Sequence, residues 1–105
     1  MDNIGFAMTL GALKELLTRC PDGDISNIMS LFTGNTAELF DNMAWFIVVL
    51  NRWYQYRETR SFDGAVTEDD ILALNINELN ALFDKAMAAF KTGNTPETEV
   101  TPTKK

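Results

Sequence analysis

The chain of 105 residues contains no histidine and only one cysteine, Cys20. A single cysteine cannot form an internal disulfide, and without histidine the usual zinc ligand sets cannot be assembled. The cysteine usage is typical of a reducing, intracellular environment. We therefore expect a fold that is stabilised by its hydrophobic core alone, which a single domain of this length can provide.

The sequence also contains few residues that could take part in catalysis. Enzymes need a nucleophile, a proton carrier or a bound metal, and the candidates left here are Cys20, the carboxylates near Asp22 and Asp69, and the tyrosines Tyr54 and Tyr56. Cys20 lies on an apolar helix stripe, where a thiol is usually a small core residue. No nucleophile elbow, phosphate-binding loop or glycine-rich dinucleotide turn occurs. We expect no catalysis, no cofactor and no metal site.

Basic patches and long apolar runs are also scarce. The net charge is -6, and the nine basic residues form no patch larger than Arg57 with Arg60 and Lys104 with Lys105. Such a balance opposes the phosphate backbone of nucleic acids. The central apolar run, Ala44–Leu50, is well short of the roughly 20 residues that span a bilayer. The expectation is a soluble, cytoplasmic protein that binds neither nucleic acid nor membrane.

That apolar run, AWFIVVL, lies inside a long stretch without glycine or proline, Thr36 to Arg60. Seven consecutive apolar residues do not alternate as a half-buried strand would, and the stretch is too long for a strand. It predicts one long helix that is apolar on two opposite sides and therefore covered on both.

Shorter helices are predicted on either side of it by start and stop signals. Thr9 is placed to cap a first helix, and Pro21 ends it; the stripe of this helix is Leu10, Leu13, Leu16, Leu17 and Cys20. Asp24 is placed to cap a short helix. Capping boxes or acidic first turns begin three further helices, at Asn35 with Glu38, at Thr67 to Asp70, and at Asn75 with Glu78.

The fold class predicted is all-α, a small helical bundle around one long central helix, with a short extended arm at Ile4–Met8. Residues 1–93 are expected to form a single helical domain, and residues 94–105, rich in threonine, proline and charge, a disordered tail. Phe62 is expected to fold back onto the core. The acids Asp63, Glu68, Asp69 and Asp70 resemble a metal cluster, but a helix N-terminus attracts acids for electrostatic reasons alone.

The aromatic residues of the long helix suggest a site. A bundle of this size cannot easily enclose every large ring, because its surface is large relative to its volume. One interpretation is that the first and last helices cover both sides of the long helix. The other is that one side is a contact surface for a protein partner or a second copy, formed by Trp45, Val49, Trp53 and Tyr56.

Three features of the sequence carry a family resemblance: the segment Ile4–Ile28 (IGFAMTLGALKELLTRCPDGDISNI), the capped acidic helix and the polar tail. Together they resemble the small tail assembly chaperones of long-tailed bacteriophages of Gram-positive hosts and their prophages. The resemblance implies a protein that is not a major part of the finished virion. Chaperones of this family bind the aggregation-prone tape-measure protein while the tail tube polymerises around it, and a longer form is often made by frameshifting. The family offers no fixed functional residues to transfer.

Two functions therefore stand as expectations. The first is a non-enzymatic tail assembly chaperone that binds the tape-measure protein in the host cytoplasm. The alternative is a small acidic helical adaptor or regulatory protein that acts through a homodimer or a host-protein interface.

Overall fold

The computed structural model describes residues 4–34 and 36–93. In chain order the elements are α1 (Leu10–Leu17), the 3-10 segments η1 (Pro21–Gly23) and η2 (Ile25–Phe32), α2 (Ala37–Thr59), α3 (Glu68–Leu72) and α4 (Ile76–Gly93), with no strand in the described ranges. The predicted all-α bundle around one long helix is confirmed. The long helix has Thr36 as its N-cap, and that side chain makes no capping hydrogen bond. Asn35, which was predicted to be the cap, and residues 94–105, which were predicted to be disordered, lie outside the described residues.

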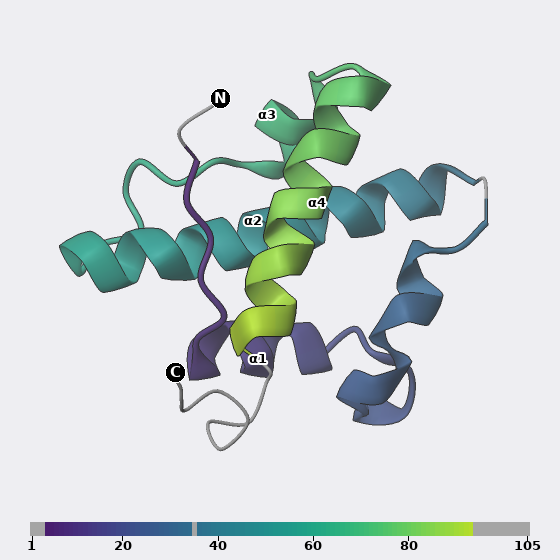
Figure 1. Ribbon diagram of the computed structural model, residues 1–105, viewed down its shortest axis with the longest axis horizontal. Coiled ribbons are helices and arrows are strands. Elements are labelled where there is room, and N and C mark those ends of the chain that lie inside the picture. Colours follow the sequence, from purple (N-terminus) through teal and green to yellow (C-terminus); the bar gives the residue numbers. More distant parts are fainter. Residues whose placement is uncertain (1–3, 35, 94–105) are drawn as a thin grey trace, which may run out of the picture.

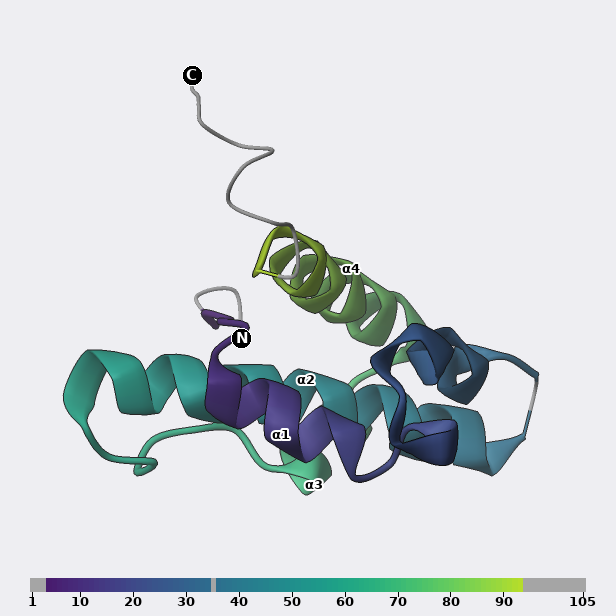
Figure 2. The ribbon, with the colours of Figure 1, turned by 90° about the horizontal axis from the view of Figure 1, so that it is seen from below.

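Helix α2 is the centre of the fold (Figure 1). In the view from below, α4 crosses above α2, α1 lies along its front, and α3 lies beneath it (Figure 2). Every residue from Met43 to Asn51 is buried as a result. Phe46 is fully buried, and its ring packs against three other rings, at centroid distances of 5.2 Å to Phe32, 5.5 Å to Phe83 and 5.8 Å to Phe90.

Local start signals account for where α1, η2, α3 and α4 begin. The hydroxyl of Thr9 accepts a hydrogen bond from the Ala12 N–H at 3.0 Å, and a carboxylate oxygen of Asp24 accepts from the Ser26 N–H at 3.0 Å. Reciprocal capping boxes are formed by the pairs Thr67 with Asp70 and Asn75 with Glu78. Each predicted cap among the described residues is confirmed, because a cap depends only on residues three or four positions apart.

The segment after Asp24 is a 3-10 helix. Its apolar residues Ile25, Ile28 and Leu31 recur every third position, which matches the three residues per turn of that helix. The short helix predicted there is therefore present in the tighter form.

Two irregular segments are attached to α2 by one side chain, Asn51, which is only 5% exposed. Its amide nitrogen donates to the Gly5 carbonyl at 2.9 Å, and its amide oxygen accepts from the Val66 N–H at 2.8 Å. The Ala7 N–H also donates to the Leu50 carbonyl at 3.1 Å. The arm Ile4–Met8 has no regular secondary structure, and these bonds hold it across the middle of the long helix.

Candidate protein-interaction surface

The four residues predicted to form a contact surface lie in two different environments. Trp45 is 9% exposed and Val49 is 2% exposed, so both belong to the core. The guanidinium of Arg19 lies 4.5 Å from the centroid of a Trp45 ring and covers it. Trp53 and Tyr56, one and two turns further on, are half-buried. The structure therefore leaves only the C-terminal pair accessible.

Trp53 and Tyr56 form an aromatic cluster with Phe62, which follows α2. The Phe62 ring stacks on Tyr56 at 4.8 Å and meets the edge of Trp53 at 5.1 Å, while the Trp53 and Tyr56 rings are 5.7 Å apart. Phe62 is 37% exposed. The prediction that Phe62 folds back onto the core is wrong, because the chain turns sharply after α2 and leaves this ring on the exposed end of the helix.

Leu10 adds an exposed apolar side chain beside this cluster. It was expected on the core-facing stripe of the first helix, but it is 82% exposed, and that expectation is wrong. The stripe that is buried is Ala12, Leu16 and Cys20. Helix α1 approaches the Trp53 ring through Gly11, where an added Cβ would lie 2.5 Å from the indole. Gly11 thus faces the Trp53 ring, whereas Leu10, the residue before it, is exposed.

Together these residues form what we call the aromatic groove. It has a volume of about 320 Å³ and is lined by Thr9, Leu10, Gly11, Trp53, Tyr56, Arg57 and Arg60. Its lining is largely apolar and includes two arginines. A groove of this kind can receive a large side chain of a partner, and Trp, Tyr and Arg are the residue types that most often anchor interfaces.

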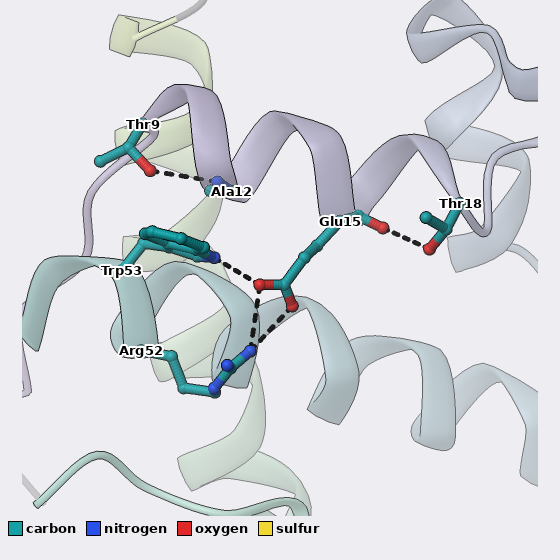
Figure 3. Close-up of polar contacts among 6 residues, drawn as sticks. All are labelled: Thr9, Ala12, Glu15, Thr18, Arg52 and Trp53. Carbon is teal, nitrogen blue, oxygen red and sulfur yellow. Dashed lines mark hydrogen bonds and ion pairs between the residues drawn. The ribbon is translucent and has the colours of Figure 1, made fainter. Parts of the chain in front are cut away.

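A polar network fixes the orientation of the Trp53 indole (Figure 3). The Glu15 carboxylate accepts from one terminal nitrogen of Arg52, with its two oxygens at 2.8 and 3.1 Å, and it also accepts from the Trp53 indole N–H. The Arg52 guanidinium in turn lies 4.6 Å from the Phe62 ring centroid. Charge-assisted hydrogen bonds of this kind hold the ring in one position.

Other features of the described residues offer less chemistry. Cys20 is buried, and burial, followed by the nearby charge of Asp24, raises the pKa of its thiol and disfavours the reactive thiolate. Asp70 is used by the cap of α3. Across residues 4–34 and 36–93, no group of three or more potential metal ligands is gathered. A second apolar hollow of about 220 Å³ lies between α2, α3 and α4, beside the exposed Leu72 and Ile76.

Comparisons of the chain with protein-family models, with curated proteins and with solved structures found no match. None of the helices in the described part of the chain has the length and apolar character needed to cross a bilayer.

Reasoning from the sequence missed Leu10 and the two arginines that line the groove, and it missed Phe62, which packs against Trp53 and Tyr56. Arg57 and Arg60 were noted only as charges that suit a helix C-terminus. One signal was available in the sequence: Gly11, the glycine inside the first helix, indicates a close approach by another element.

Proposed function

We propose that the protein is a non-enzymatic assembly chaperone that binds an apolar segment of a client protein in the aromatic groove. One observation carries this proposal: Leu10, 82% exposed, stands beside the half-buried Trp53 and Tyr56 at a groove of about 320 Å³. Exposure of a leucine side chain to water is unfavourable in the monomer. Burying this side chain together with the two rings would therefore stabilise a complex.

The fixed indole also supports binding. Because Glu15 and Arg52 already hold Trp53 in place, less side-chain freedom is lost when a partner binds. Taken with the resemblance to tail assembly chaperones, the client we propose is a phage tape-measure protein, bound in the host cytoplasm during tail assembly without a cofactor. Trp45 and Val49 would support this surface from within the core.

The test is co-expression with a tape-measure-like protein encoded by a neighbouring gene, followed by measurement of the soluble fraction of that client. Leu10→Ser and Trp53→Ala should reduce the soluble fraction. Met29→Ser is the matched control, because Met29 is 51% exposed on η2 and lies outside the groove. Client solubility that is unaffected by both groove substitutions, with both variants folded, would contradict the assignment of the groove.

The adaptor alternative has one observation in its favour, the second apolar hollow with Leu72 at 47% and Ile76 at 51% exposure. A homodimer through this surface would appear in light scattering as a mass that rises with concentration. Ile76→Ser should then restore the monomer, whereas Leu10→Ser should not.

A further inference from the structure

We infer that the aromatic groove selects acidic client segments, in which a large apolar side chain enters the groove and neighbouring carboxylates pair with Arg57 and Arg60. This inference rests on the proposed function and adds the chemistry of the partner. It depends on where the positive charge lies in an otherwise acidic molecule.

The chain carries a net charge of -6, yet three of its four arginines, Arg52, Arg57 and Arg60, occur within nine residues at the end of α2. Arg52 is already paired with Glu15. Arg57 and Arg60 are exposed, and neither side chain makes an ion pair or hydrogen bond with the described residues. The nearest acid in sequence, Glu58, does not line the groove. The guanidinium groups of Arg57 and Arg60, which have no ion-pair partner among the described residues, therefore lie together at one end of an acidic protein.

Both arginines line the same groove as Leu10, Trp53 and Tyr56. A guanidinium offers several N–H donors in a fixed plane and can bind a carboxylate through two parallel hydrogen bonds. The largely apolar lining would exclude water when a partner's side chain fills the groove, and such pairs are stronger where water is excluded. The groove is thus complementary to an amphipathic segment that carries glutamate or aspartate next to its apolar anchor.

The backbone of Arg60 is an independent observation. Arg60 ends α2 with φ 60° and ψ 25°, the left-handed conformation, and its N–H donates to the Tyr56 carbonyl at 2.7 Å. Glycine is the residue that usually occupies this position, because it has no Cβ to clash there. An arginine here lowers stability and places a guanidinium at the edge of the groove. Strained residues of this kind often occur at functional sites.

Nucleic acid is the rival anionic partner, since arginine and aromatic rings also bind single strands. Two features favour the protein segment. The net charge of -6 repels a phosphate backbone, and the groove that Arg57 and Arg60 line has a volume of only about 320 Å³, which is sized for a side chain.

The test uses the full chain and three synthetic amphipathic helical peptides that share one leucine and phenylalanine face. They differ only in the flanking residues, which are glutamate, glutamine or lysine. Calorimetry should show the glutamate peptide binding about tenfold more tightly than the glutamine peptide, and the lysine peptide binding most weakly. Added salt should narrow these differences.

Two substitutions should weaken the preference for the glutamate peptide while leaving the apolar part of the groove in place. Arg57→Gln should reduce the advantage of the glutamate peptide to a few-fold. Arg60→Gly should do the same while raising the midpoint of thermal unfolding, because it relieves the left-handed strain. Lys85→Gln, an equal charge change on the exposed side of α4, is the control and should alter neither quantity.

The outcomes separate this inference from the proposed function. If Trp53→Ala abolishes client protection but the three peptides bind equally, the acidic preference is wrong and the chaperone function stands. If no peptide binds and the groove variants protect the client fully, both are wrong. Tighter binding of an oligothymidylate than of the glutamate peptide would overturn the inference in favour of a nucleic-acid partner.

Discussion

The middle of α2 and its last turns belong to one continuous helix, but they lie in different environments. From Met43 to Asn51 every residue is buried, and the apolar side chains there pack against α1, α3, α4 and η2. From Arg52 to Arg60 no residue is fully buried, and the segment contains three aromatic residues and three arginines. Figure 2 shows this end of α2 extending past the helices that cover its middle.

The difference teaches that aromatic content alone does not locate a binding surface in a small bundle. Trp45 and Trp53 are the same residue type on the same side of one helix, eight positions apart. Trp45 is enclosed because Arg19 and the core surround it, whereas the ring of Trp53 borders a groove. The neighbours of a ring in three dimensions decide whether it stabilises the fold or remains available to a partner.

The largest expected effect comes from substituting the same residue type in both regions. Phe46→Ala removes a fully buried ring with three aromatic neighbours and should lower the free energy of unfolding by about 3–5 kcal/mol. Phe62→Ala, at the exposed end, should cost about 1 kcal/mol. Urea denaturation measures both. Equal costs would break the distinction between the two regions.

The boundary between the two regions is Asn51, and its loss should have the next largest effect. Asn51→Ala leaves the Gly5 carbonyl and the Val66 N–H without their partner in a buried setting. We expect a loss of about 2–3 kcal/mol in urea denaturation, together with faster amide exchange at Val66. Asn42→Ala, at a half-buried site with hydrogen bonds to Arg19 and Leu31, should cost about 1 kcal/mol. A smaller effect at position 51 than at position 42 would contradict the role of Asn51.

A substitution at Glu15 tests, within the exposed end of α2, whether the position of the Trp53 indole matters more for client binding than for stability. Glu15→Gln keeps an oxygen for the Trp53 indole but removes the charge that pairs with Arg52. Because both charged groups are one-third exposed, stability should fall by only about 0.5 kcal/mol. Client binding should weaken more noticeably, since the indole is held less firmly. Glu38→Gln, an exposed acid away from the groove, is the control, and equal weakening of client binding there would contradict the positioning role.

The smallest expected effect is a dependence on pH at the start of η2, far from the groove. Hydrogen bonds from the Ser26 N–H and hydroxyl lower the pKa of Asp24 below its ordinary value of 3.8. A carboxylate whose pKa is lower in the folded state stabilises the fold above its ordinary pKa. That contribution is lost as the pH falls through the lower, folded-state value.

Asp24→Asn keeps the cap but does not titrate, so it should flatten this part of the curve of stability against pH without altering client binding. A variant whose stability still falls over the same acidic range would show that another group is responsible. Circular dichroism at graded pH measures the effect.

Much of the fold could be predicted from the sequence because its signals are local. Thr9, Asp24, Thr67 and Asn75 each cap a helix through residues no more than four positions away, and the long run without glycine or proline predicted α2. The buried centre followed from the apolar run. These features do not require knowledge of which segments meet in space.

The composition of the groove could not be predicted, because it depends on contacts between distant segments. Gly11, next to the exposed Leu10, packs against a ring 42 positions further along the chain, and Phe62 stacks on Tyr56 outside the core. The enclosure of Trp45 likewise depends on Arg19, 26 positions earlier. Hydrophobic periodicity describes one helix at a time and carries no information about such pairings.

The separation of the two tryptophans gives the protein a built-in pair of optical reporters. The emission of Trp45, enclosed beneath Arg19, should change when the tertiary structure melts, whereas that of Trp53, hydrogen-bonded to Glu15 at the edge of the groove, should respond to whatever enters there. A variant with phenylalanine at one position leaves the other indole to be followed alone. Unfolding and occupancy of the groove can thus be monitored separately, without an attached dye.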